Sequence, residues 1–308
     1  MSVNVTIPNA SSSSSSRVLR ITSLLFILAL LGSLLASCAP SAGPSGNTPS
    51  TPQSAAAENA QPAEGQVIKI KVGASPVPHA EILQYIKENL AAKEGLEITI
   101  VEFTDYVQPN LALADGQIDA NYFQHVPYME DFAKEHKLNL SVAASVHIEP
   151  LGIYSKKVKS LTEVPDKSIV AIPNDATNGG RALQLLAANG LIKLKEGVGV
   201  NAIVQDIVEN PKNLQIKELE AAQLPRSLDD TAISVINGNF AIEAGLTPSK
   251  DALALESGEN NPYANILAVV KGKENDPGIA KLVKLLNSPE VKKFIEEKYQ
   301  GSVLPAFQ

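Results

Sequence analysis

The single cysteine of this 308-residue chain, Cys38, comes shortly after the only long apolar run, residues 21–35. A helix that spans a bilayer needs about 20 apolar residues, so this run of 15 is short for a permanent membrane span. Arg17 and Arg20 lie before the run and small residues follow it, a pattern typical of a secretory signal peptide. One cysteine also excludes an internal disulfide and a thiolate metal site. We therefore expect a folded part that begins after this segment and has no covalent cross-link.

The four residues Leu35-Ala36-Ser37-Cys38 resemble the bacterial lipoprotein signal, in which cleavage precedes the cysteine and its thiol receives diacylglycerol. We therefore expect residues 1–37 to be a lipoprotein signal peptide and Cys38 to be lipidated with chains such as palmitate. Two or three acyl chains suffice for stable anchoring without a helix. The expected location is the extracytoplasmic face of the cell membrane. The alternative is an uncleaved signal anchor in which the cysteine is incidental.

The segment 38–66 is expected to be the acylated cysteine followed by a flexible tether. It is rich in Pro, Ser, Ala and Gly and lacks large apolar side chains, so it cannot offset the entropy cost of ordering. Removal of residues 1–37 leaves 24 basic against 33 acidic side chains, a net charge of −9. Nucleic-acid binding calls for a basic face, so this balance argues against a nucleic-acid partner.

The remaining residues, 67–308, alternate predicted strands and helices. Hydrophobic alternation predicts strands, and apolar residues at helical spacing predict helices. The expected strands are 67–73, 96–103, 118–121, 140–147, 152–154, 168–173, 214–219, 232–236 and 266–270. The expected helices are 80–93, 109–115, 181–189, 279–286 and 289–299. Such repetition indicates an α/β fold with mostly parallel sheets flanked by helices.

The strand–helix–strand pattern occurs before and after about residue 152, which indicates two lobes. We expect lobe I to comprise residues 67–153 with 266–308, and lobe II to comprise residues 154–265. Two extended stretches, 151–155 and 266–270, are the candidates for joining the lobes. No sequence repeat of fixed period is found.

Motifs that would support catalysis are missing from the sequence. It has no G-x-S-x-G elbow, no Walker lysine loop and no H-E-x-x-H, and Gly179-Gly180 lacks dinucleotide-binding spacing. We expect no enzymatic activity, no cofactor and no resident metal. His125, His147 and Glu149 would in principle form a metal site, although two histidines and one carboxylate from different loops are a weak pattern. A structural role or a ligand contact is the favoured interpretation of each histidine.

Groups suited to binding are more abundant. Arg181 begins a predicted helix, where free N–H groups and a guanidinium fork favour an anion; the alternative is a surface ion pair. Asn237 and Asn265 lie near strand ends, where ligands meet α/β sheets, although turn chemistry explains Asn-Gly equally well. An aromatic cluster with polar neighbours indicates a cleft wall, against the alternative of ordinary core. Its members are Tyr106, Tyr122, Phe123, Tyr128 and Phe132.

Seven segments together resemble the methionine-binding lipoproteins of ABC importers, the NlpA or MetQ family. They cover most of residues 67–308 in order. The segments are FTDYVQPNLALADGQIDANYFQHVPYM, IEPLGIYSKKVKSL, IPNDATNGGRAL, GLIKLKEGVG, IVENPKNLQIKELEAAQLPRSLDD, INGNFAIEAGLTPSKDAL and NPYANI. One departure is Thr231-Ala232, where many relatives have Val-Asp.

The resemblance implies a two-lobe fold of the periplasmic-binding-protein type that closes over a ligand in the interlobe cleft. It also implies the site residues. The implied thioether pocket is Tyr106, Phe123, His125 and Tyr128; the implied carboxylate anchor is Arg181 with Asn178; the implied amino-acid head-group residues are Asn237 and Asn265. By the same matching, Glu149 is expected near the cleft rim.

The implied function is a lipid-anchored binding protein that captures L-methionine and delivers it to an ABC permease with a separate ATPase subunit. Arg181 would meet the carboxylate, and the carbonyl oxygen of Asn237 or Asn265 would accept from the ammonium, since an unmatched buried charge is costly. D-methionine or a methionine dipeptide is an alternative ligand. A metal-capture lipoprotein that uses His125, His147 and Glu149 is the alternative from another class.

Overall fold

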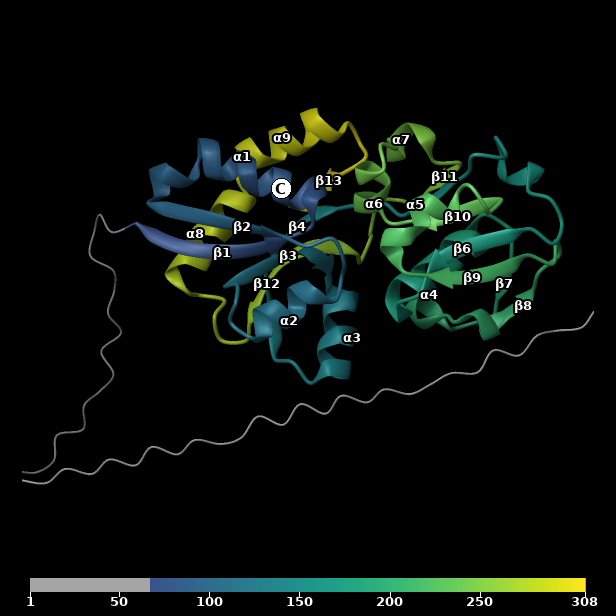
Figure 1. Ribbon diagram of the computed structural model, residues 1–308, viewed down its shortest axis with the longest axis horizontal. Helices are drawn as coiled ribbons and strands as arrows, with labels where there is room; N and C mark the ends of the chain where they lie inside the picture. Colours follow the sequence, from purple (N-terminus) through teal and green to yellow (C-terminus); the bar gives the residue numbers. More distant parts are fainter. Residues whose placement is uncertain (1–66, 308) are drawn as a thin grey trace, which may run out of the picture. The chain divides into compact units, whose positions relative to one another are not determined.

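The structure, a computed structural model, describes residues 67–307. The expected signal peptide, the expected lipidation site Cys38 and the expected tether to residue 66 lie outside the described residues. Within residues 67–307, no helix has the length and apolar character needed to cross a membrane. The described part contains two large β-sheets, each with helices on both faces (Figure 1).

The first sheet has six strands. In sheet order they are β13 (Leu304–Pro305), β4 (Leu140–Ile148), β12 (Ala264–Val270), β3 (Ala120–His125), β1 (Ile68–Ala74) and β2 (Leu96–Glu102). The alternation predicted for the first strand is present, because Ile70 and Val72 are buried whereas Lys69 and Lys71 are exposed. Period-two burial of this kind holds the strand register.

The sequence analysis predicted mostly parallel strands, but this sheet is mixed. β1 is parallel to β2 and β3, but β12 is antiparallel to both β3 and β4, and β13 is antiparallel to β4. β3 and β4 therefore run the same way, with helix α3 (Val126–His136) between them in sequence. β12 returns from the second sheet and enters between them in the opposite direction, which makes the sheet mixed.

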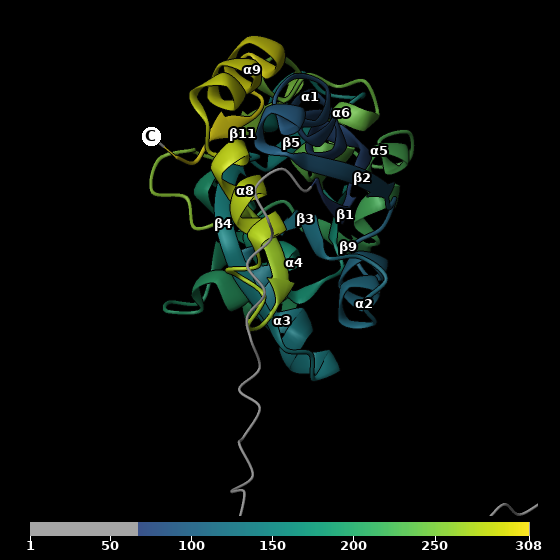
Figure 2. The ribbon, with the colours of Figure 1, turned by 90° about the vertical axis from the view of Figure 1, so that its left-hand side faces the viewer.

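Helices cover both faces of the first sheet. α1 (Glu81–Asn89), α8 (Pro277–Leu286) and α9 (Pro289–Tyr299) bury their apolar residues in one core with β1. α2 (Gln108–Ala114) and α3 pack on the side opposite α1 and α9, as Figures 1 and 2 both show. The sequence predicted one helix over residues 80–93. The chain instead forms α1, which is flanked by helical turns at Pro76–Ala80 and Ala91–Glu94.

The second sheet has five strands and is also mixed. In sheet order they are β11 (Ala254–Leu255), β5 (Gly152–Tyr154), β10 (Ile233–Ile236), β6 (Ile169–Pro173) and β9 (Gln215–Leu219). Val170 and Ile172 face a core that contains helix α4 (Ala176–Ala188). Ala171 faces the opposite core, which contains α5 (Leu224–Ser227) and α6 (Gly238–Glu243). Smaller elements are α7 (Pro248–Asp251) and the ribbon of β7 (Lys193–Leu194) with β8 (Ile207–Glu209).

Within residues 67–307 the chain passes between the two sheets twice, through residues 149–151 and 256–263. The stretches expected to join the lobes lie beside these connections, because β5 belongs to the second sheet and β12 to the first. β5 begins at residue 152 and β12 at residue 264, each two residues before the expected lobe limit at residue 154 or 266. The division into lobe I and lobe II as domains stays a prediction.

Candidate functional site

A buried pocket lies where strands of both sheets end, as is common for ligand sites in α/β proteins. His125 ends β3, Asn237 follows β10, and α4 begins directly after β6. The cavity is small: its volume of about 20 Å³ has room for about one water molecule. It is lined by Tyr106, Phe123, Gln124, His125, Tyr128, Glu149, Asn178, Arg181, Asn237, Gly238, Asn239 and Asn265.

The structure brings all nine residues expected from the family resemblance to this one pocket. Three further lining residues, Gln124, Gly238 and Asn239, were not among the expected site residues. Asn239 had a signal, because it lies two residues after Asn237 in an Asn-Gly-Asn segment, but turn chemistry explained that segment equally well. The segment instead starts helix α6 and directs Asn239 to the pocket.

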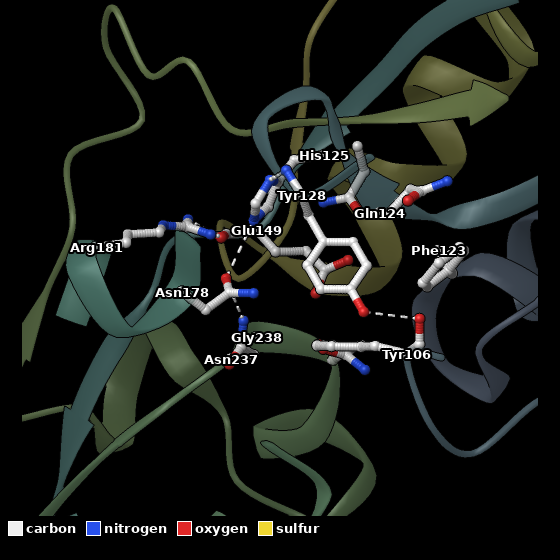
Figure 3. Close-up of a pocket in the computed structure, with 12 residues that line it drawn as sticks. Tyr106, Phe123, Gln124, His125, Tyr128, Glu149, Asn178, Arg181, Asn237 and Gly238 are labelled. Carbon is white, nitrogen blue, oxygen red and sulfur yellow. Dashed lines mark hydrogen bonds between the residues drawn. The ribbon is translucent and has the colours of Figure 1, made fainter. Parts of the chain in front are cut away.

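The aromatic side chains gather at one end of the pocket, and Arg181 lies at the other (Figure 3). The ring of Tyr106 lies 6.0 Å from that of Phe123, 5.7 Å from that of Tyr128 and 5.0 Å from that of Phe240. Hydrogen bonds fix the phenols, because the Tyr106 hydroxyl donates to Asn239 Oδ1 at 2.6 Å and the Tyr128 hydroxyl donates to the Tyr106 carbonyl at 2.9 Å. This end of the pocket is therefore apolar, with preset rings.

His125 connects the aromatic wall to the polar residues. It is the N-cap of α3, where its Nδ1 accepts the Tyr128 backbone N–H at 3.2 Å. Its Nε2 therefore carries the proton and donates to Asn178 Oδ1 at 3.1 Å. Burial, reinforced by Arg181, lowers the pKa of His125 to about 3, so the ring is neutral at physiological pH. Helix α3 was not among the helices expected from the sequence, and histidine is not among the preferred N-cap residues.

Asn178 organises the polar end. Its Oδ1 accepts from His125 and, at 3.0 Å, from Asn237 Nδ2. Its Nδ2 donates to the carboxylate oxygens of Asp175 at 2.9 and 3.1 Å. Because both the oxygen and the nitrogen of its amide already have protein partners, Asn178 orients its neighbours and has no unpaired atom for a ligand among the described residues.

Helix α4 begins five residues earlier than the sequence predicted. Asp175 is its N-cap and accepts the Asn178 N–H at 2.9 Å. Gly180 therefore lies inside the helix, where a Cβ atom would come within 2.3 Å of the Val200 carbonyl oxygen. Helical glycine is unfavourable in general, which explains the misplaced start, but here it permits close packing. The prediction that free N–H groups at the helix start bind an anion is wrong in part, since the Asp175 side chain accepts one of them.

Arg181, the sixth residue of α4, is only 4 % exposed. Its Nε donates to Glu256 Oε1 at 3.0 Å, and its Nη2 donates to Glu256 Oε2 at 2.5 Å and to the Glu149 carbonyl at 2.9 Å. The Tyr263 ring covers the guanidinium at 4.1 Å. Arg181 is thus in an ion pair, but a buried one. Its two-donor edge, which the sequence analysis assigned to a ligand carboxylate, is filled by Glu256.

Two buried amide atoms at the pocket have no hydrogen-bond partner in the part of the chain that the structure describes: Asn237 Oδ1 and Asn239 Nδ2. Both side chains are at least nine-tenths buried. Leaving a buried polar group unpaired costs about 1–3 kcal/mol, so native proteins satisfy most of them. One unpaired acceptor and one unpaired donor are therefore available to a bound molecule.

Asn265 is arranged differently from Asn237. The Nε2 of His79 lies 3.0 Å from Asn265 Oδ1 and 3.2 Å from Glu149 Oε1. Burial lowers the pKa of His79 to about 4, so the neutral ring donates its N–H to both oxygens. The carbonyl oxygen of Asn265, one of the two expected ammonium acceptors, thus already accepts one hydrogen bond, whereas that of Asn237 accepts none from the described residues.

The resemblance implied that Glu149 lies near the cleft rim, but the residue is 5 % exposed and lies in the buried wall of the pocket. His147 donates from Nε2 to Glu149 Oε1 at 2.8 Å, and its Nδ1 accepts the Tyr122 hydroxyl. Burial raises the pKa of Glu149 and lowers that of His147 to about 3. His79 and His147 therefore both donate to this carboxyl group; the sequence analysis had grouped His147 with Glu149 but had given His79 no role there.

His79, His147 and Glu149 are also the described residues best placed to hold a metal ion, because one ligand atom of each lies within 4.8 Å of the others. His125 is not a member of this group, so the metal set proposed from sequence is wrong in that residue. The separations of 2.8 and 3.2 Å to Glu149 Oε1 equally fit hydrogen bonds from two neutral imidazoles.

Two β-sheets, each covered by helices and joined to the other by two connections, with a buried pocket where their strands end, define a two-lobe solute-binding protein. The chain belongs to the NlpA lipoprotein family, whose family model matches residues 70–307.

Curated relatives agree with this assignment. The D-methionine-binding lipoprotein MetQ of Escherichia coli is 44% identical over 237 residues, which cover 76% of this chain and 87% of the relative. The methionine-binding lipoprotein MetQ of Bacillus subtilis is 44% identical over 257 residues, 82% of this chain and 93% of the relative. The structure of a nutrient binding protein from Burkholderia cenocepacia bound to methionine is similar with a TM-score of 0.75 and 48% identity, over 77% of this chain and 100% of that one.

Proposed function

We propose that this protein is the lipid-anchored substrate-binding component of an ABC importer and that it captures L-methionine. The observation that carries the proposal is the polarity of the pocket. Aromatic rings line one end, while Arg181, the unpaired Asn237 Oδ1 and the unpaired Asn239 Nδ2 lie among the polar groups. The names of the Escherichia coli, Bacillus subtilis and Burkholderia cenocepacia relatives support methionine as the ligand.

A zwitterionic amino acid matches these groups. The ligand carboxylate would accept from Arg181, and its ammonium would donate to Asn237 Oδ1, so that neither buried charge is left unmatched. The thioether would pack among Tyr106, Phe123 and Tyr128, where each sulfur–aromatic contact contributes about 0.3–1.5 kcal/mol. Glu149, whose carboxyl group is held by hydrogen bonds from His79 and His147, would be part of the polar wall around the ligand.

The proposal includes the location and the partners. Diacylglycerol on Cys38 would hold the protein at the extracytoplasmic face of the membrane, and the permease with its ATPase would receive the ligand. The protein itself would carry out no reaction. A Cys38→Ser variant tests the anchor: it should move from the membrane fraction to the soluble fraction after cell breakage, whereas retention in the membrane would contradict lipidation at this residue.

Calorimetric titration of the ligand-stripped protein with L-methionine tests the ligand assignment. Arg181→Ala should weaken binding at least about tenfold, because it removes a charged hydrogen-bond donor. Arg226→Ala is the matched control, since Arg226 is an exposed residue away from the pocket. Absence of both heat and a thermal shift with the wild type would contradict the proposal. Parallel titrations with D-methionine and methionine dipeptides rank the alternative ligands.

Metal capture is the second candidate function, and the spacing of His79, His147 and Glu149 is the observation that favours it. Metal analysis of the purified protein separates the two candidates. Stoichiometric zinc or manganese that is lost in a His147→Gln variant would favour metal capture, whereas a metal-free protein that binds L-methionine would exclude it.

A further inference from the structure

Glu256 lies outside the pocket lining, yet it makes the most extensive contact with Arg181. Its carboxylate faces the edge of the guanidinium formed by Nε and Nη2, with separations of 3.0 Å from Nε to Oε1 and 3.2 Å from Nε to Oε2. The side chain of Glu256 is 19% exposed, and that of Arg181 is 4% exposed. The pair is therefore largely removed from water, where charged hydrogen bonds are strong and geometrically specific.

The same carboxylate is tied to both connections between the sheets. Glu256 begins the connection 256–263, and its Oε2 accepts from Asn261 Nδ2 at 2.9 Å in that segment. It also accepts the Leu151 backbone N–H at 3.3 Å, from the other connection, 149–151. Arg181 adds a donor to the Glu149 carbonyl and a stacking contact with Tyr263. The guanidinium thus contacts both connections.

These contacts leave one nitrogen of Arg181 available. Nε and Nη2 have protein acceptors, whereas Nη1 has none among residues 67–307. Arg181 lines the pocket and Glu256 does not. Glu256 therefore holds the guanidinium from the side away from the cavity, and a ligand carboxylate has to approach the remaining edge.

We propose that Glu256 is a positioning residue: its carboxylate fixes Arg181 so that Nη1 is presented to the carboxylate of the bound ligand. This inference rests on the proposed function. A carboxylate beside the anchor also repels a ligand anion, but it lies on the opposite edge of the guanidinium. Loss of the fixed geometry in a buried site therefore outweighs the relief of repulsion. Glu256 then contributes to recognition of the carboxylate specifically, and not to recognition of the side chain.

The test compares Glu256→Gln with Glu259→Gln, which makes the same change at an exposed residue of the same connection. Each ligand-stripped protein is titrated with L-methionine and with L-methioninamide, which lacks the carboxylate. Glu256→Gln should bind L-methionine about tenfold more weakly, the effect of one charged hydrogen bond. Its affinity for L-methioninamide should change by less than about threefold, so the ratio of the two affinities falls. Glu259→Gln should match the wild type with both ligands.

Three outcomes would overturn the inference. Tighter binding of L-methionine by Glu256→Gln would make Glu256 a competitor of the ligand; equal weakening of both ligands would make its role merely structural; and unchanged binding would give it no role. If Glu256→Gln does not fold, Asn261→Ala removes a donor that holds Glu256 and should lower the same ratio to a smaller extent; an unchanged ratio would overturn the inference. A wild-type protein that binds no L-methionine would instead refute the proposed function.

Discussion

Asn237 combines a paired and an unpaired amide atom. Its Nδ2 donates to Asn178 Oδ1, which fixes the orientation of the amide, while its buried Oδ1 has no partner within residues 67–307. An arrangement of this kind favours a ligand that brings a donor, since the cost of the unpaired oxygen is recovered on binding. We therefore expect Asn237 to be a more specific acceptor for a ligand ammonium than Asn265.

Replacement of Asn237 by Ala should weaken L-methionine binding by about tenfold to a hundredfold, the value of a hydrogen bond to a charged group. 4-(Methylthio)butanoate, which has no nitrogen and so no donor for Asn237 Oδ1, should bind the variant about as well as it binds the wild type. Calorimetric titration measures both affinities. Asn189→Ala, at the C-terminal end of α4 and outside the pocket lining, is the control. Equal loss of affinity for both compounds would contradict the pairing of Asn237 with the ammonium.

The aromatic end leads to a prediction about the ligand's sulfur. L-norleucine replaces the thioether sulfur by a methylene group of similar shape and keeps the zwitterion. Tyr106, Phe123 and Tyr128 should favour sulfur by about 0.3–1.5 kcal/mol per contact, so norleucine should bind up to about tenfold more weakly than methionine. Competition titrations measure this ratio. Norleucine binding that is as tight as methionine binding would show that the rings select for size and not for sulfur.

Among the secondary-structure elements, α4 has the greatest influence on the site because it carries both Asn178 and Arg181. Gly180 allows this helix to approach the backbone at Val200. Gly180→Ala should lower the free energy of unfolding by about 1 kcal/mol, because overpacking typically costs about 1–3 kcal/mol and the helical gain from alanine is about 1 kcal/mol.

Gly179→Ala is the comparison for that prediction. A Cβ atom at Gly179 would lie 3.0 Å from the Pro173 carbonyl oxygen, a milder contact than the 2.3 Å at Gly180. Urea denaturation of both variants should therefore place Gly180→Ala below Gly179→Ala in stability. A Gly180→Ala variant as stable as the wild type would mean that the segment near Val200 yields without cost.

The strands were the most predictable elements. Alternating or continuous apolar runs located β1, β2, β4, β6, β9, β10 and β12 to within about two residues. Helix starts were less predictable, because α3 is capped by a histidine and α4 contains two glycines near its start. Strand direction was wrong for β12, since local pattern does not show which neighbours a returning strand will have.

The pocket residues were predictable because they lie in motifs of the resembled family, and not because of their local pattern. Glu256 has no such motif and lies in an irregular connection, so its contact with Arg181 depends on a fold that brings residues 75 positions apart together. His79 is far in sequence from His147 and Glu149 and meets them only through the first sheet and the turn at Pro76–Ala80. Long-range polar contacts of this kind were beyond the sequence analysis.

For the molecule as a whole, the buried titratable groups determine how stability depends on pH. Burial lowers the pKa of His79 to about 4 and those of His125 and His147 to about 3. In the unfolded chain these rings bind protons below about pH 6.5. Burial raises the pKa of Glu149 and of Asp175, so these carboxylates bind protons at a higher pH in the folded protein than in the unfolded chain. As the pH falls, their protonation therefore stabilises the folded state, opposite to the effect of the histidines.

The histidines therefore favour the unfolded state as the pH falls below about 6.5, and the contribution grows until the pH reaches their folded pKa values near 4 and 3. We expect the free energy of unfolding to decrease from pH 6.5 to pH 4 by less than three independent histidines would cause, because Glu149 and Asp175 offset part of the proton uptake. Urea denaturation at a series of pH values measures this slope.

One histidine can be removed from this balance while its N-cap hydrogen bond is kept. His125→Asn keeps an N-cap acceptor for α3 but removes one titratable ring. The slope of the unfolding free energy against pH should fall by up to about 1.4 kcal/mol per pH unit, the contribution of one proton. His136→Asn, the same substitution at an exposed histidine, is the control. If His125→Asn leaves the slope unchanged, the ring of His125 does not stay neutral in the folded protein down to pH 4, and burial at the pocket does not lower its pKa.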